Sequence, residues 1–74
     1  MTYNGWSNYQ TWNVALYIQN EYDMHQLAVL NKCTYEELAP VIVDMFGPVT
    51  PDGVSYSDPT LDQVELDEML QELG

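Results

Sequence analysis

Three glutamates near the end of the sequence, Glu65, Glu68 and Glu72, follow one another at intervals of three and four residues. On an α-helix this spacing places the carboxylates in one stripe, with Asp62 and Asp67 beside it. Like charges so placed repel each other by about 0.2–0.5 kcal/mol per pair, and no Lys or Arg lies nearby to offset them. Because uncompensated carboxylates attract basic groups, these five residues are the first candidate binding site.

The acidic stripe has two interpretations. One is a solvated face that only keeps the protein in solution. The other is imitation of nucleic-acid phosphates, because Glu65 to Glu72 would span about 10 Å along a helix, or about three phosphate steps. Almost any acidic helix meets that criterion. Asp44, Asp52 and Asp58 would extend the acidic surface if the loop that holds the last two folds back beside the helix.

The charge of the whole chain restricts the class of partner. Its 74 residues include twelve Asp and Glu but one basic residue, Lys32, which gives a formal net charge of -11. Binding to DNA, RNA or anionic membranes through phosphates requires Lys and Arg to displace counterions. We therefore expect no direct contact with nucleic acid or membranes. The expected partner is a basic surface of another protein.

Few other side chains suggest chemistry. His25 is the only histidine, and no Ser or Cys accompanies it in a catalytic pattern. Cys33 is the only cysteine, so it cannot form an intrachain disulfide, and we expect it to be half-buried. The loop around Asp52 and Asp58 lacks the residue order of a calcium-binding loop. We expect no enzymatic activity, no cofactor and no dedicated metal site.

The first half of the sequence predicts two helices. Ser7 and Gln10 have the form of a capping box at the start of a helix over about 8–20. The apolar surface of this helix is wide, so we expect a central helix that is covered on more than one side. Asn13 and Asn20 share the narrower polar strip. A second helix is expected at about 24–32, capped by Asp23, with two leucines facing inward. Those leucines are Leu27 and Leu30.

A third helix begins with the capping-box pair Thr34 and Glu37 and runs to about residue 46. Pro40 removes one backbone hydrogen bond inside it, so we expect a kink or a break there. Gly47, followed by proline, ends it.

A last helix is capped by Asp58 or by Thr60 with Gln63, and runs to about Leu73. Its predicted packing stripe is apolar and separate from the glutamates. The stripe consists of Leu66, Met69, Leu70 and Leu73.

Together these elements predict one mainly α domain over residues 1–74. It should be a compact bundle of three to four short helices, with a turn-rich loop or short hairpin at about 47–59. A hydrophobic content of 46% argues against disorder. No signal peptide and no run of about 20 apolar residues is present, so we expect a soluble, cytoplasmic protein.

Aromatic residues crowd the N-terminal segment. Core packing accounts for most of them, but Tyr and Trp also anchor protein interfaces. Trp6 and Tyr3 are therefore a second candidate contact, with a partner protein or across a homodimer.

The segments YNGWSNYQTWNVAL at 3–16, TPDGV at 50–54 and LDEML at 66–70 resemble a family of small uncharacterised proteins of phages and bacteria. Members carry an N-Y-x-T-W-N-V-A-L-like motif. Tyr17 stands where that family commonly has Trp, and Glu21 where it commonly has Asp. The resemblance implies a compact helical domain and a phage origin, but no activity, ligand or catalytic residue.

The sequence thus favours a non-enzymatic acidic protein-binding factor. In a phage, it would be a host-takeover or counter-defence inhibitor that mimics nucleic acid and occupies a basic groove of a host protein in the host cytoplasm. One alternative is an interaction module that binds a host regulatory or metabolic protein through the aromatic N-terminal segment. Another is a small homo-oligomeric structural protein.

Overall fold

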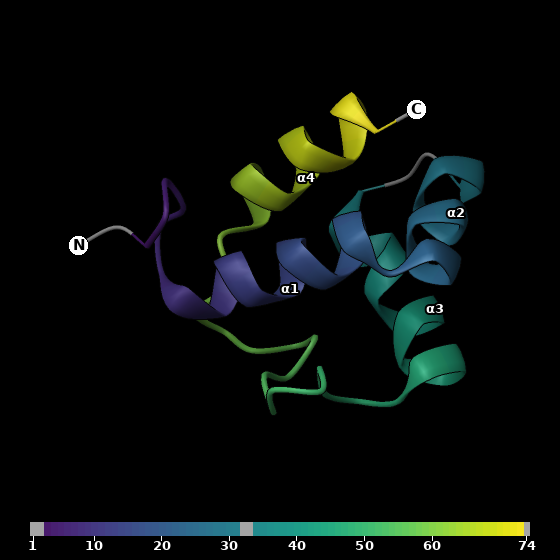
Figure 1. Cartoon of the computed structure of the whole chain (residues 1–74), viewed down its shortest axis with the longest axis horizontal. Helices are drawn as coiled ribbons and strands as arrows, with labels where there is room; N and C mark the ends of the chain where they lie inside the picture. Colours follow the sequence, from purple (N-terminus) through teal and green to yellow (C-terminus); the bar gives the residue numbers. More distant parts are fainter. Residues whose placement is uncertain (1–2, 32–33, 74) are drawn as a thin grey trace.

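The computed structural model describes residues 3–31 and 34–73, so Lys32 and the expected half-buried Cys33 lie outside the described residues. α1 lies at the centre, with α4 along one side, α2 and α3 beyond its C-terminal end, and the connection between α3 and α4 along the opposite side (Figure 1). The molecule measures 32 × 24 × 19 Å. The described helices are α1 (Tyr9–Asn20), α2 (Tyr22–Asn31), α3 (Tyr35–Phe46) and α4 (Gln63–Glu72). The predicted mainly α bundle is confirmed.

α1 begins one residue later than the predicted cap. Asn8 is its N-cap, and its side-chain oxygen accepts the N–H of Thr11 at 2.8 Å. The predicted capping box of Ser7 and Gln10 is wrong, because Ser7 directs both its N–H and its hydroxyl to carboxylates near the start of α4. The helix boundaries were nevertheless close to those expected.

α2 buries a different face from the one predicted. Met24 and Ala28 are buried, and Leu27 is half-buried against the core. Leu30, which was expected to face inward, is 79% exposed. The reason is helical geometry: Leu30 follows Ala28 by two residues, which is about 200° around the helix. It therefore points away from the face that Met24 and Ala28 define.

The capping box of Thr34 and Glu37 at the start of α3 is confirmed. α3 then runs without interruption through Pro40 to Phe46, so the predicted break does not occur. Because Pro40 has no N–H, the carbonyl of Glu36 lacks its usual helical donor. Both residues are at the surface. Water can satisfy that carbonyl there, which lowers the cost of a proline inside the helix.

The connection from α3 to α4 is a turn-rich loop with a single antiparallel bridge between Val49 and Ser55. Inside the bridge, the N–H of Thr50 donates to the carbonyl of Val54, and the N–H of Gly53 donates to the carbonyl of Thr50, both at 2.8 Å. Gly53 has a φ of 91°, which favours glycine at this position. The loop is therefore a tight turn with the beginning of a hairpin.

α4 is capped by Asp62, whose carboxylate accepts the N–H of Glu65 at 3.1 Å. Neither predicted alternative is right. Asp58 instead accepts the N–H of Thr60 within the loop, at 2.8 Å. A residue predicted as part of the binding surface, Asp62, thus has a structural role.

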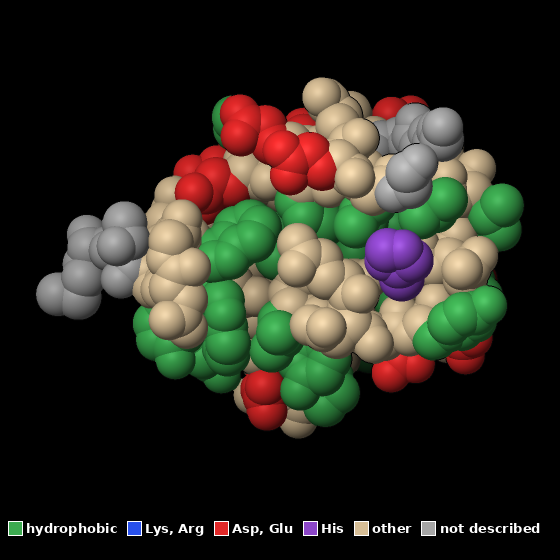
Figure 2. Space-filling view, turned by 45° about the horizontal axis from the view of Figure 1, so that its top comes forward, with side chains coloured by type: hydrophobic (Ala, Val, Ile, Leu, Met, Phe, Trp, Pro, Cys, Tyr) green, Lys and Arg blue, Asp and Glu red, His purple; other side chains and the backbone are tan. Residues whose placement is uncertain are grey.

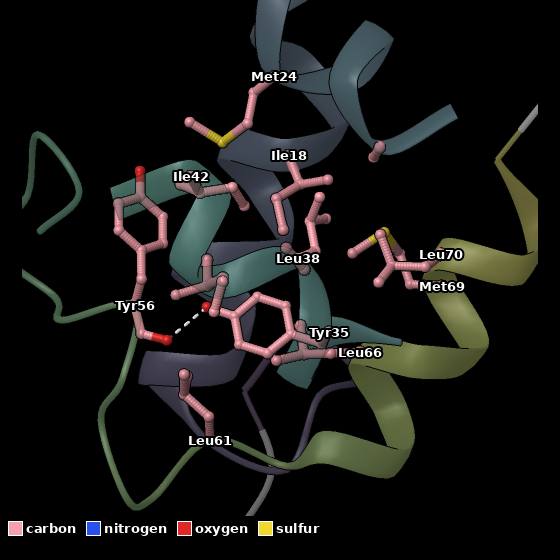
Figure 3. Packing of buried hydrophobic residues seen from close by; sticks show 14 of the residues in the cluster. Ile18, Met24, Tyr35, Leu38, Ile42, Tyr56, Leu61, Leu66, Met69 and Leu70 are labelled. Carbon is pink, nitrogen blue, oxygen red and sulfur yellow. Dashed lines mark hydrogen bonds between the residues drawn. The ribbon is translucent and has the colours of Figure 1, made fainter. Parts of the chain in front are cut away.

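The core forms where α1, α3 and α4 meet (Figure 3). Ile18 of α1 and Leu38 of α3 lie near the buried side of α4, where Leu66, Met69 and Leu70 confirm the predicted packing stripe. Within the core, the hydroxyl of Tyr35 donates to the backbone carbonyl of Tyr56 at 2.6 Å (Figure 3). This bond fastens the α3–α4 loop to α3.

Candidate functional site

Three of the five carboxylates predicted to bind a partner make hydrogen bonds inside the protein. Glu65 accepts the backbone N–H of Ser7, and Asp62 accepts the hydroxyl of the same serine, both at 2.8 Å. Asp67 accepts the backbone N–H of Tyr35, the first residue of α3, at 2.7 Å. These carboxylates join the N-terminal segment and α3 to α4, so the acidic helix is also a packing element.

The bonds to Asp62 change its titration. The backbone N–H of Glu65 is the largest cause, followed by the hydroxyl of Ser7, and together they lower the pKa of the Asp62 carboxyl. Both donors favour the charged form. Asp62 therefore carries its negative charge at the start of α4, where the helix dipole also favours an anion.

Glu68 and Glu72 differ from these carboxylates. Both are exposed, and within 3–31 and 34–73 their side chains make no hydrogen bond. Figure 2 shows acidic side chains gathered over the edge of the molecule that α4 forms, next to a patch of hydrophobic side chains. These two glutamates are thus the carboxylates of the predicted stripe that are most available to a partner.

A groove of about 190 Å³ brings Trp6 together with the glutamate stripe. Its lining includes Trp6 from the N-terminal segment and Glu65, Glu68 and Glu72 from α4, with Gln19 of α1 beside them. Trp6, one of the two residues of the predicted aromatic site, therefore shares a surface with the predicted glutamate stripe. We call this surface the Trp6 groove.

A tight turn sets the position of Trp6. Tyr3 and Trp6 exchange backbone hydrogen bonds of 2.7 and 2.8 Å. Between them, Asn4 and Gly5 have φ angles of 49° and 89°. Positive φ at both central residues is the requirement of a type I′ turn, for which Asn-Gly is a preferred sequence. The Asn-Gly pair is thus the sequence signal for this turn.

Tyr3, the other predicted aromatic contact, is not part of the Trp6 groove lining. Its ring packs against Trp12 and Tyr9, with centroid distances of 4.9 and 5.4 Å. Tyr3 remains 41% exposed and Tyr9 38% exposed. Of the two predicted aromatic residues, Trp6 lines the groove, and Tyr3 packs with Tyr9 and Trp12.

Asn13 is the main residue that sequence reasoning misplaced. It was expected on a polar strip with Asn20, but it is fully buried. Its side-chain oxygen accepts the hydroxyl of Thr50 at 2.6 Å, and its amide donates to Asp52 at 2.8 Å. The hydroxyl of Tyr17 donates to the same carboxylate oxygen at 3.0 Å. Because buried polar groups need partners, we interpret this network as a clamp that holds the 50–53 turn against α1.

Reactive clusters are scarce in the part of the chain that the structure describes. Within it, no group of three or more His, Cys, Asp and Glu side chains is arranged to hold a metal ion. The Nδ1 atom of His25 is buried and has no hydrogen-bond partner among the described residues. No helix in the described ranges has the length and apolar content needed to cross a bilayer.

Comparison with known proteins identifies the family. The whole chain, residues 1–74, matches a family of unknown function, DUF7249. The chain therefore belongs to this family. This agrees with the expectation that it is a member of an uncharacterised family of small proteins. Searches of curated proteins and of solved structures found no match.

Proposed function

We propose that this member of the DUF7249 family is a non-enzymatic protein-binding factor, and that its Trp6 groove holds a basic segment of another protein. The observation that carries the proposal is the shared lining of the groove, to which Trp6 and three glutamates all contribute. An aromatic face and carboxylates are the two kinds of group that bind Lys and Arg side chains.

The two free glutamates would provide most of the polar contacts. Glu68 and Glu72 are exposed and four residues apart, so they repel each other on one face of α4. A guanidinium or ammonium group placed between them would relieve that repulsion. The same cation, or its apolar stem, would lie against Trp6, where a cation–π contact contributes about 0.5–2 kcal/mol depending on exposure.

The net charge of -11 supports the same kind of partner. A field of one sign attracts an oppositely charged surface over several ångströms, which speeds encounter and weakens as salt is added. Because the twelve carboxylates occur on several faces of the protein, this attraction would bring a basic partner near. The Trp6 groove would then fix where it binds.

Imitation of nucleic acid is a narrower form of this proposal. It requires an extended row of free carboxylates, whereas Asp62, Glu65 and Asp67 accept hydrogen bonds from Ser7 and Tyr35. The geometry therefore favours docking of one basic segment over replacement of a phosphate backbone. A phage inhibitor that occupies the nucleic-acid groove of a host protein is a special case of this proposal. In that case added DNA would compete with the protein for its partner.

A pull-down from bacterial lysate with charge-matched variants tests the proposal. The double substitution Glu68→Gln/Glu72→Gln removes two charges from the groove. Its control, Asp23→Asn/Asp44→Asn, removes two charges from exposed positions on α2 and α3. We expect the first double variant to lose a partner that the wild type and the control retain at low salt. Equal retention by both variants would contradict the groove as the binding surface.

Two further arms of that experiment separate the alternatives. A partner released by added DNA would be a nucleic-acid-binding protein, as the imitation hypothesis requires. A partner that survives a high-salt wash and is lost on substitution of Tyr3 would instead bind the exposed rings of Tyr3 and Tyr9.

A further inference from the structure

A second hollow, of about 440 Å³, lies at the C-terminal end of α1. Its buried floor includes Met24, Thr50 and Tyr56, and the half-buried rings of Tyr17 and Phe46 line its sides. The volume is within the range of about 300–1,000 Å³ typical of small-molecule sites. Tyr17 and the groove residue Gln19 lie about 200° apart around α1, so this aromatic pocket opens on a different face from the Trp6 groove.

The rings of the aromatic pocket are not paired with each other. In the described ranges, the close ring pairs lie among Tyr3, Tyr9 and Trp12, away from the pocket. Tyr17, Phe46 and Tyr56 come from α1, from α3 and from the loop after it, and they meet around the hollow. Tyr17 and Phe46 are the half-buried rings that a ligand in this hollow would contact, whereas Tyr56 is buried beneath them.

The electrostatic environment of this pocket is negative. Glu21 is the one ionisable carboxylate among its lining residues, and it lies directly after the C-terminal end of α1. The C-terminal end of a helix carries a partial negative charge, and the last turn of α1 contains no basic residue. The positive N-terminal end of α2, which begins at Tyr22, lies next to it, so the Glu21 carboxylate is the main group that would attract a cation to the pocket.

Residues at the pocket are held in place by hydrogen bonds within the protein. The hydroxyl of Tyr17 donates to Asp52 at 3.0 Å, which fixes the orientation of that ring. Asp52 is itself held by Asn13 at 2.8 Å, and the backbone of Tyr56 accepts the hydroxyl of Tyr35 at 2.6 Å. A site that is already formed loses less freedom when it binds.

From these observations we infer that the aromatic pocket binds a small organic cation with an alkylated ammonium group. Its methyl groups would contact Tyr17 and Phe46, and Glu21 would balance its charge. A simple metal ion or ammonium ion is strongly hydrated and gains little from aromatic walls. An alkylated ammonium is weakly hydrated, and aromatic cages are a known way of recognising it. This site does not depend on the proposed function of the Trp6 groove.

Titration with choline, followed by heteronuclear NMR of the full chain, tests the inference. Saturable shifts are expected for the amides of Tyr17, Phe46 and the residues around Thr50. The uncharged isostere of choline, with a quaternary carbon in place of nitrogen, should bind at least about threefold more weakly, which corresponds to the lower range of cation–π energies. Equal binding of the isostere, or no saturable shift with choline, would overturn the inference.

Two charge-matched variants locate the binding site. Glu21→Gln should weaken choline binding by about threefold or more. Asp44→Asn removes one charge from an exposed position that lies outside both the aromatic pocket and the Trp6 groove, so it should leave choline affinity unchanged. The amide spectrum of each variant shows directly whether it is folded. If both variants weakened choline equally, the cation would be bound by net charge alone and the pocket would be rejected.

Discussion

The side-chain amide of Asn13 donates a 2.8 Å hydrogen bond to the carboxylate of Asp52, and so joins the central helix to a turn 39 residues further along the chain. Asn13 also accepts the hydroxyl of Thr50, and Tyr17 donates to Asp52 from one helical turn further along α1. The clamp holds a turn-rich loop that has only one β-bridge of its own. The shape of the aromatic pocket, which includes Tyr17 and Thr50, depends on it.

Loss of this clamp should destabilise the protein. In Asn13→Ala the buried hydroxyl of Thr50 loses its acceptor, which should lower the free energy of unfolding by about 1–3 kcal/mol. Asn20→Ala, on the exposed side of the same helix, should change it by less than about 0.5 kcal/mol. Urea unfolding of both variants measures the difference. Equal stabilities would mean that the clamp contributes nothing to the fold.

Tyr35 should make the protein sensitive to alkaline pH. Burial, with a smaller contribution from Tyr56, raises the pKa of the Tyr35 hydroxyl well above its usual value. The folded state therefore favours the neutral form. The resulting stability is fully present below the unfolded pKa of about 10 and is lost as the pH rises above it towards the folded pKa.

Thermal unfolding across this pH range checks the contribution of Tyr35. At neutral pH, Tyr35→Phe should cost about 1–3 kcal/mol, because the Tyr56 carbonyl loses its donor. Above pH of about 10, its melting temperature should fall less steeply than that of the wild type. Tyr22→Phe, at a position 69% exposed, is the control and should follow the wild type. Parallel curves for all three proteins would refute the account.

Substitutions of neighbouring carboxylates on α4 should differ in their effect on stability, because some of these carboxylates make hydrogen bonds within the protein and others do not. Asp67 accepts the N–H of Tyr35 at the start of α3, so Asp67→Ala should cost about 1 kcal/mol, as for the loss of a helix cap. Glu68→Gln, one residue later and exposed, should change stability by less than about 0.5 kcal/mol. Denaturant unfolding compares them, and a larger effect of the Glu68 substitution would reverse this division.

Local signals in the sequence predicted much of the fold. The capping box of Thr34 and Glu37 and the apolar stripe that includes Leu66 and Leu70 act within one or two helical turns, so their spacing identifies them. The same spacing identified the glutamate stripe. Residues with distant partners were predicted less well, because their role depends on how the helices pack.

Ser7, Asn13 and Asp67 illustrate that limit. Serine is a residue type that commonly caps a helix, but the hydrogen-bond partners of Ser7 lie 55 and 58 residues away. Asn13 looks polar within its helix, yet it is buried because the 50–53 turn closes over it. Asp67 looks like a surface charge until α3 packs beside α4. The meeting of Trp6 with the glutamates also depends on packing, because no interval in the sequence relates them.

Binding of a basic segment in the Trp6 groove can be followed through the indole N–H signals of Trp6 and Trp12. We would titrate the full chain with a peptide of arginine and lysine and follow both signals by NMR. We expect a saturable shift of the Trp6 signal and of the α4 amides, with little change at Trp12. Glu68→Gln/Glu72→Gln should bind the peptide more weakly than Asp23→Asn/Asp44→Asn. Saturable binding that shifts Trp12, α2 or α3 while Trp6 stays unchanged would contradict binding in the Trp6 groove.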